Sequence, residues 1–144
     1  MIHRRRLTTH DYASMKAIAD PRSVAVIGAS EKSYSFGGKT LNNFSDLAIP
    51  VYPVNSRYTE IGGRRCYSSV AEIEETPDLA VLAVPRDAVE SLVEDCAKAG
   101  VRGALIYASG YAETGLADRI AMQERLAAIA RDTGMRIVGP NCLG

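Results

Sequence analysis

The sequence of 144 residues has no tryptophan, and it is poor in histidine and cysteine, two side chains that often act in catalysis or metal binding: it has two histidines and three cysteines. His3 and His10 both precede the first predicted strand, so no histidine is available as a base in the rest of the chain. Cys66, Cys96 and Cys142 are an odd number with neither CxxC nor Cys/His spacing, which argues against a disulfide framework and a zinc site. We therefore expect no bound metal and a reducing compartment.

Net charge and long apolar runs are also missing. Lys plus Arg and Asp plus Glu both number 17, so the overall charge does not indicate nucleic acid as a partner. The one basic run, residues 3–6, is most simply a solvated tail. No apolar stretch approaches the ~20 residues of a membrane span, and the order of a signal peptide is absent. The expectation is a cytoplasmic protein with no membrane partner.

What the chain does have is a series of short apolar runs that alternate with segments of helical periodicity. The run 79–84 has no polar alternation, which indicates a strand covered on both faces. The alternation predicts an α/β protein: a Rossmann-like, doubly wound, parallel five-stranded sheet in the order 3-2-1-4-5 with helices on both faces. Residues 1–20 are interpreted as a tail and short helix, and residues 21–144 as one domain. The predicted strands are 24–27, 51–54, 79–84, 104–107 and 136–138.

Capping signals place the helices between these strands. Asp87 with Glu90 has capping-box spacing ahead of an apolar stripe, and Ser69 with Glu72 repeats that spacing. Helices are therefore predicted over 8–19, 38–47, 70–75, 87–99 and 117–133.

The residues after the first strand indicate a phosphate site. Ligands of such sheets bind outside the carboxyl ends of the strands where the order reverses, which we expect between strands one and four. Strand one is followed by Gly28-Ala29-Ser30, and a glycine there lets a ligand and the next helix N-terminus come close. The loop departs from the dinucleotide pattern G-x-G-x-x-G, since the next glycines are Gly37-Gly38. A tight turn without a ligand is the alternative.

The end of strand two lacks the acidic residue that NAD-binding domains use to accept from the ribose hydroxyls. It reads Val54-Asn55-Ser56-Arg57, where Asn55 suits ribose or adenine edges and Arg57 can hold phosphate oxygens. Arg64 follows the same strand and could approach the same phosphate, although a solvated turn arginine is the alternative for both. These residues favour a nucleotide with an extra ribose phosphate, which means coenzyme A or NADP.

Five ordered stretches carry a family resemblance: VAVIGAS, then VYPVN with IGGRRCYSSV, then DLAVLAVP, ASGYAETG and GPNCLG. Together they resemble the CoA-binding domain of NDP-forming (ADP-forming) acyl-CoA synthetases, which is related to the N-terminal domain of the succinyl-CoA synthetase alpha subunit. The match runs in order from about residue 20 to residue 144. The resemblance implies a Rossmann-like domain that holds CoA across its carboxyl edge.

The resemblance also implies where CoA lies. The glycine loop would contact its phosphates, the turn after strand two its adenosine, and the ASGY stretch, with Glu113, its pantetheine arm, while the GPNC turn would lie near the thiol. Glu113 more simply bonds backbone N–H groups, and Cys142 lacks the base that a nucleophile needs. No catalytic or metal-binding residue is implied. The implied CoA-binding residues are Gly28, Ala29, Ser30, Lys39, Asn55, Arg57, Val84, Pro85, Ser109, Gly110, Tyr111, Asn141 and Cys142.

The family implies a larger enzyme as well. Its members interconvert acid, CoA and nucleoside triphosphate with acyl-CoA, nucleoside diphosphate and phosphate through a phosphorylated histidine beyond the matching segment. We therefore expect this segment to bind CoA or acyl-CoA beside the remaining synthetase domains or subunits, without turnover of its own. Assembly as a homo-oligomer is compatible with this. Three alternatives stay open: a stand-alone CoA-binding regulatory module, a CoA-binding domain fused to an acetyltransferase, and an NAD(P)-binding dehydrogenase domain.

Overall fold

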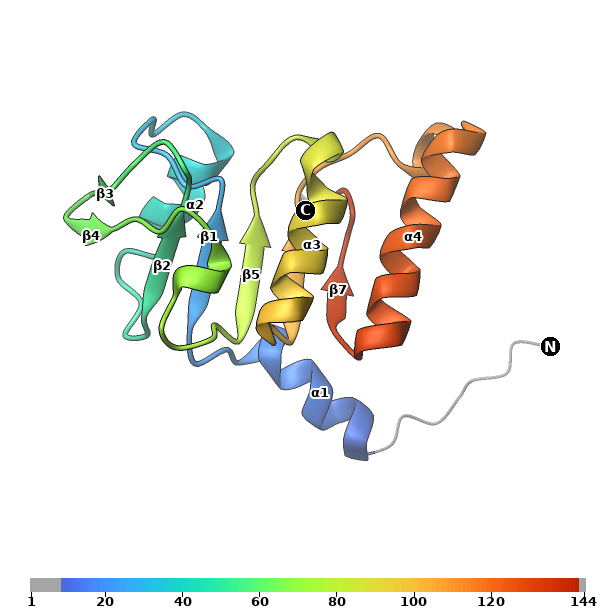
Figure 1. The fold of residues 1–144 in the computed structure, drawn as a ribbon, viewed down its shortest axis with the longest axis horizontal. Helices are drawn as coiled ribbons and strands as arrows, with labels where there is room; N and C mark the ends of the chain where they lie inside the picture. Colours follow the sequence, from blue (N-terminus) through green and yellow to red (C-terminus); the bar gives the residue numbers. More distant parts are fainter. Residues whose placement is uncertain (1–8, 143–144) are drawn as a thin grey trace.

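The computed structural model describes residues 9–142, in which the five predicted strands form one parallel sheet (Figure 1). Every residue of the first strand, Val24–Ile27, and of the third, Leu79–Leu82, is buried, so both strands are covered on both faces of the sheet. The predicted fold class is confirmed. The strands are β1 (Val24–Ile27), β2 (Val51–Val54), β5 (Leu79–Leu82), β6 (Gly103–Ile106) and β7 (Arg136–Val138).

The order of the strands differs from the predicted 3-2-1-4-5. β1 pairs with β2 on one side and β5 on the other, so the sheet runs β2-β1-β5-β6-β7, or 2-1-3-4-5 counted along the chain. Pro53 in β2 has no N–H to donate, which suits an edge strand and not one paired on both sides. β5, which is buried throughout, takes the central place that its apolar sequence requires. The order therefore reverses between β1 and β5.

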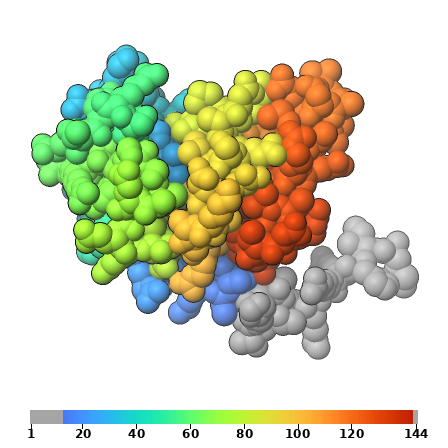
Figure 2. Space-filling view, in the orientation of Figure 1, coloured from blue at the N-terminus to red at the C-terminus, as the bar shows by residue number. Residues whose placement is uncertain are grey.

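Helices cover both faces of this sheet. Because successive side chains of a strand point to opposite faces, Ile27 of β1 packs in one cluster with Val93 of α3, whereas Val26 packs with Leu41 of α2. Figure 2 shows α3 and α4 lying side by side over the first of these faces. Among residues 9–142, no helix combines the length and apolar character needed to cross a membrane. The helices are α1 (Thr9–Ala19), α2 (Phe36–Asn43), α3 (Arg86–Ala99) and α4 (Ala117–Thr133).

The helix α2 begins and ends earlier than the predicted 38–47. Ser35 caps it, because its Oγ accepts a hydrogen bond of 3.0 Å from the backbone N–H of Gly38. The helix then stops at Asn43, which leaves Leu47 outside it and 44% exposed. The start of the helix is thereby brought close to the end of β1.

Neither predicted capping box forms. Pro85 occupies the N-cap position of α3, so Asp87 lies inside the first turn. Ser69 makes no side-chain cap at the short 3-10 helix η1 (Val70–Glu72), and Glu72 instead accepts hydrogen bonds from the N–H and hydroxyl of Ser68. α4 has the predicted bounds. The sequence did not predict the hairpin of β3 (Glu60–Ile61) and β4 (Arg64–Arg65) or the 3-10 helix η2 (Ala112–Thr114).

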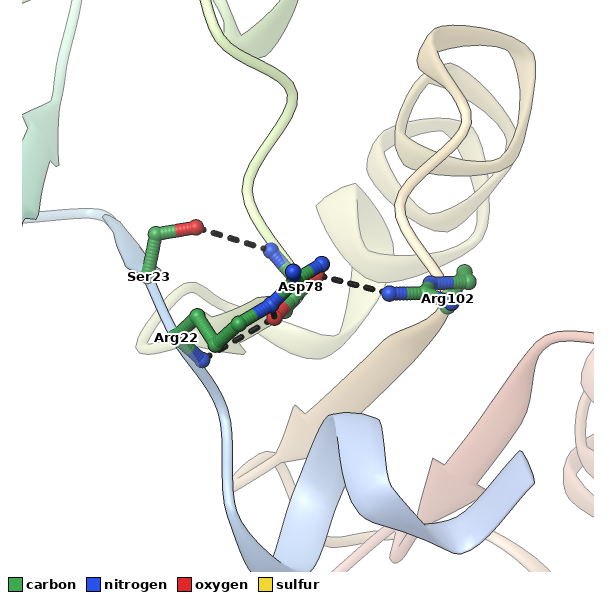
Figure 3. A network of polar contacts seen from close by, with 4 residues as sticks. All are labelled: Arg22, Ser23, Asp78 and Arg102. Atoms are coloured by element: carbon green, nitrogen blue, oxygen red, sulfur yellow. Dashed lines mark hydrogen bonds and ion pairs between the residues drawn. The ribbon is translucent and has the colours of Figure 1, made fainter. Parts of the chain in front are cut away.

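A polar network joins the segments that enter three strands (Figure 3). The Asp78 carboxylate, just before β5, accepts hydrogen bonds of 2.9 Å from the backbone N–H of Arg22 and from Nη2 of Arg102. The backbone N–H of Asp78 donates to Oγ of Ser23 at 3.2 Å. These contacts fix the amino edge of the sheet, opposite the edge where a ligand is expected.

Candidate functional site

A cavity of about 700 Å³ opens at the carboxyl edge of the sheet, between the ends of β1 and β5. The predicted crevice lay between strands one and four, and this was wrong because β5 occupies the place beside β1. The volume is typical of a site for a small molecule. The lining residues come from the loop after β1 and from the residues that follow β5 and β6: Gly28, Ser30, Tyr34, Ser35, Phe36, Gly37, Ala83, Val84, Pro85, Arg86, Asp87, Tyr107, Ala108 and Ser109.

Two glycines, Gly28 and Gly37, line this cavity, and we call the backbone at these two residues its floor. Gly28 has φ +85°, and a Cβ there would overlap the carbonyl oxygen of Ala83. A Cβ on Gly37, in the first turn of α2, would overlap the carbonyl oxygen of Gly28. The backbones of β1, β5 and α2 therefore meet at a distance that only glycine permits.

The N-terminus of α2 lies at this floor, because Phe36 and Gly37, its first two residues, line the cavity. Its first turn carries no acidic residue, so the positive end of the helix dipole is not neutralised there. The preceding loop is held by its own polar contacts: Ser30 Oγ accepts from the N–H of Lys32 at 3.1 Å, and Ser35 Oγ donates to the Lys32 carbonyl at 2.7 Å. This arrangement favours a phosphate.

Aromatic side chains form one wall of the cavity. Tyr34 is 73% and Phe36 56% exposed, although both line the cavity. Phe36 lies 6.2 Å from Tyr107, measured between ring centroids, and the hydroxyl of Tyr107 accepts a hydrogen bond of 3.0 Å from Thr40. Large apolar rings that remain exposed beside a cavity provide surface for a flat or apolar part of a ligand.

The loop after β6 is organised by Glu113. Its carboxylate accepts backbone hydrogen bonds from Gly110 at 2.6 Å and Tyr111 at 3.0 Å, and these bonds hold its pKa below the usual value. Tyr111 is 1% exposed, and its burial raises the pKa of its phenol. Glu113 thus has the simpler structural role that the sequence offered for it, and Tyr111 belongs to the core.

The cavity lining includes part of the predicted site. Ala29 is fully buried behind the lining. Asn55 uses its amide inside the protein, because Nδ2 donates to the Ala29 carbonyl at 2.8 Å and Oδ1 accepts from the N–H of Arg57 at 2.9 Å. Asn55 therefore stabilises the glycine loop through its hydrogen bond to the Ala29 carbonyl. The predicted residues that do line the cavity are Gly28, Ser30, Val84, Pro85 and Ser109, while Lys39, Arg57, Gly110, Tyr111, Asn141 and Cys142 are not among the lining residues.

The turn after β7 is attached to the end of β6. The backbone N–H of Asn141 donates to the carbonyl of Ala108 at 2.8 Å, and that of Cys142 donates to Ile106 at 3.1 Å. Asn141 has φ +59°, and the Gly139–Pro140 peptide bond is cis. Cys142 is half-buried, and the remainder of the GPNCLG stretch, residues 143–144, lies outside the described residues.

Nine of the lining residues were not among the implied CoA-binding residues, and four of these nine carry large side chains: Tyr34, Phe36, Arg86 and Tyr107. Tyr34 and Phe36 lie between Gly28 and Gly37 in the sequence. Two aromatic residues beside a predicted phosphate-binding turn were the signal that could have indicated them. Arg86 directly follows the predicted Pro85, so its place at a strand end could have indicated it. Tyr107 offered no such signal, because it was assigned to the fourth strand.

Comparison with known proteins agrees with this geometry. A family model described as a CoA binding domain matches residues 22–144. The acetate–CoA ligase (ADP-forming) of Methanocaldococcus jannaschii is 41% identical over 93% of this chain, which spans 18% of that protein. The dinucleotide-forming acetyl-coenzyme A synthetase 1 of Ca. Korarchaeum cryptofilum superposes with a TM-score of 0.84 at 35% identity, over 90% of this chain and 28% of that one.

A protein of similar length also has this fold. A hypothetical protein from Pyrococcus horikoshii OT3 superposes with a TM-score of 0.70 at 25% identity, over 95% of this chain and 87% of that protein. The chain thus spans about a fifth of the ligase relative and nearly all of the smaller protein. Since the family model covers most of the chain, this protein belongs to the CoA-binding domain family found in ADP-forming acetate–CoA ligases.

Proposed function

We propose that this chain holds CoA in the cavity beside Gly28 and acts as the CoA-binding part of an ADP-forming acid–CoA ligase. The observation that supports the proposal is the agreement between the family match over residues 22–144 and a glycine-floored cavity at the point where the strand order reverses. CoA fits this floor because its diphosphate can approach backbone where a Cβ would stand.

The proposed placement of CoA follows the chemistry of the walls. The phosphates lie over Gly28 and Ser30 at the start of α2, and the aromatic wall takes an apolar part of the cofactor. Arg57 and Lys39 are proposed to contact the ribose phosphate, and Asn55 acts indirectly by holding the loop at Ala29. We propose that four residues outside the cavity lining help to position the pantetheine arm: Gly110, Tyr111, Asn141 and Cys142.

The wider protein is also part of the proposal. Residues 21–144 are proposed as one domain, with 1–20 as a tail and short helix, of a cytoplasmic synthetase whose other domains or subunits supply the phosphorylated histidine, the nucleotide site and the acid site. A homo-oligomeric assembly fits this proposal. The relative's name specifies acetate, and we propose a carboxylic acid as the substrate class here.

Isothermal titration of the 144-residue chain with CoA, NADP, NAD and ATP tests the binding step. We expect CoA to bind and NAD to bind at least tenfold more weakly. Tighter binding of NAD or NADP than of CoA would support the dehydrogenase alternative and overturn the proposal.

The ligase activity is tested with the complete protein. We expect ATP to be converted to ADP and phosphate only when both CoA and a carboxylic acid are present, with no turnover by residues 1–144 alone. Formation of AMP, or no dependence on CoA, contradicts the ligase proposal without affecting the CoA-binding proposal.

A stand-alone CoA-binding module is the second candidate, because a protein of nearly this length has the same fold. The native polypeptide distinguishes the two. A single product of the size of this chain in its own cells, detected with an antibody against the domain, supports the module, whereas a product several times larger supports the ligase.

A further inference from the structure

The cavity contains one residue whose charge suits the anionic part of the cofactor and which the CoA-binding motifs did not include. Arg86 is the first residue of α3 and follows the N-cap residue Pro85. Among the lining residues, all within 9–142, it is the only cation, and its side chain is 27% exposed. A partly buried guanidinium beside a phosphate-binding floor is a strong donor to an anion.

The donors of Arg86 are not fully used inside the protein. Its Nε is buried and makes no hydrogen bond. The nearest carboxylate oxygen, Oδ1 of Asp87, is 3.5 Å from Nε, and the Asp87 side chain is 83% exposed. An ion pair of this length to a carboxylate that is itself exposed contributes little, so a ligand oxygen can replace it at small cost. A buried N–H without a partner favours such a ligand.

The loop after β6 fixes the direction of the guanidinium. A Cβ on Gly110 would overlap Nη1 of Arg86, so the absence of a side chain at Gly110 makes room for the arginine. On the other side, the buried hydroxyl of Tyr111 lies 3.4 Å from the backbone carbonyl of Arg86 and donates to it. Gly110 thus has a defined role: it accommodates Arg86.

Arg86 is also close in sequence and space to the phosphate floor. A Cβ on Gly28 would overlap the Ala83 carbonyl oxygen and would lie 2.9 Å from Cγ1 of Val84, so β5 passes directly beside the glycine loop. Arg86 comes two residues after Val84 and lines the same cavity as Gly28. A diphosphate over Gly28 would therefore lie in the cavity that the start of α2 and Arg86 both line.

We propose that Arg86 is a further cofactor-positioning residue, whose guanidinium donates hydrogen bonds to the diphosphate of CoA. This inference rests on the proposed placement of CoA beside Gly28. It distinguishes Arg86 from Arg57, which is proposed to contact the ribose phosphate after β2. Arg86 then binds the diphosphate, and Arg57 binds the ribose phosphate of the same cofactor.

Arg86→Gln, Arg86→Lys and wild type are titrated with CoA and with dephospho-CoA, which keeps the diphosphate but lacks the ribose phosphate. Arg131→Gln, which removes an equal charge from the exposed last turn of α4, is the matched control. We expect Arg86→Gln to weaken both ligands by the same factor, about tenfold, because a hydrogen bond to a charged group is lost. Arg86→Lys keeps the charge but not the fork, so we expect a loss of about threefold.

Each other result overturns a different statement. If wild type binds CoA and Arg86→Gln binds both ligands as wild type does, the role of Arg86 is wrong. If only CoA is weakened, Arg86 reads the ribose phosphate and the diphosphate assignment is wrong. If thermal unfolding shows that Arg86→Gln is destabilised, Arg86→Lys decides the matter. A stable Arg86→Lys that binds both ligands about threefold more weakly than wild type and Arg131→Gln supports the proposal, whereas equal binding of Arg86→Lys and wild type overturns the role of the fork. Failure of wild type to bind either ligand refutes the CoA proposal itself.

Discussion

Asp78 accepts two hydrogen bonds from Arg22, one from the backbone N–H at 2.9 Å and one from Nε at 3.2 Å. The first fixes the backbone of the segment that leads into β1, and the second adds an ion pair to it. Nη2 of Arg102, just before β6, donates to the other carboxylate oxygen at 2.9 Å. One carboxylate therefore sets the relative positions of three strand starts (Figure 3), and through them the carboxyl edge where CoA is proposed to bind.

The first prediction concerns the acid stability that Asp78 confers. Burial raises its pKa, but the N–H of Arg22 and the guanidinium of Arg102 outweigh this and hold the pKa at about 2, below the usual 3.8. A lowered folded-state pKa stabilises the protein above the unfolded-state value, and this contribution is lost as pH falls from about 4 toward 2. The shift corresponds to about 2 kcal/mol, which exposure of the arginines reduces to about 1–2 kcal/mol.

Urea unfolding of wild type and Asp78→Asn at pH 6 and pH 2.5 measures this contribution. We expect the free energy of unfolding of Asp78→Asn to be about 1–2 kcal/mol lower at pH 6, with the difference shrinking at pH 2.5. Asp95→Asn, which removes a 59%-exposed carboxylate 3.9 Å from Lys98, is the control and should change stability by less than about 0.5 kcal/mol. An unchanged difference between the two pH values contradicts the prediction.

The second prediction separates backbone strain from close approach at Gly28. Gly28→Ala places a Cβ against the Ala83 carbonyl at φ +85°, so we expect a loss of about 2–4 kcal/mol and no measurable CoA binding. Gly134→Ala is the control, because its φ of +75° is similar but nothing lies within 4 Å of its Cβ. That variant should lose about 1 kcal/mol and bind CoA normally. Equal destabilisation of the two variants would show that strain alone explains the glycine.

The fold class could be predicted because the strand signals are local. The sequence also contained two signals for the correct strand order. A strand with apolar residues on both faces, such as β5, belongs in the centre of the sheet, and a strand that contains a proline, such as β2 with Pro53, belongs at an edge. The prediction instead used the commonest order of doubly wound sheets, which puts β5 at the edge.

The site was harder to predict because side-chain direction depends on the loops. Asn55 and Arg57 both follow β2, yet the amide of Asn55 turns inward to Ala29 and neither residue lines the cavity. Arg86, by contrast, lines the cavity because Gly110, 24 positions away in the sequence, leaves room for its guanidinium. Such a pairing of distant residues has no local sequence signal.

The third prediction tests the aromatic wall. Phe36→Ala removes a ring that is 56% exposed and lines the cavity, so we expect unfolding free energy to change by less than about 1 kcal/mol and CoA to bind about tenfold more weakly. Leu116→Ala, at the N-cap of α4, removes an apolar side chain with the same 56% exposure outside the cavity lining. Titration with CoA should show no effect of Leu116→Ala. A similar loss in both variants would contradict a role for the wall.

The fourth prediction concerns the three thiols. Cys96 is fully buried, and burial raises its pKa to about 12, while burial also raises the pKa of the Cys66 thiol. Thiolates react and thiols do not, so both should resist alkylation in the folded protein. Cys142 is half-buried at the carboxyl edge and should react first. Iodoacetamide labelling at pH 8, read residue by residue by mass spectrometry, measures the three rates.

Acetyl-CoA, which has no free thiol to consume the reagent, extends this experiment to the ligand path. If the pantetheine arm passes the GPNC turn as proposed, saturating acetyl-CoA should slow the labelling of Cys142 at least fivefold. The labelling of Cys66 and Cys96 should stay slow with or without ligand, which controls for a general change in stability. Protection of Cys142 in wild type but not in Gly28→Ala ties the effect to the cavity. Rapid labelling of Cys142 under saturating acetyl-CoA would place the thiol end of the cofactor elsewhere on the carboxyl edge.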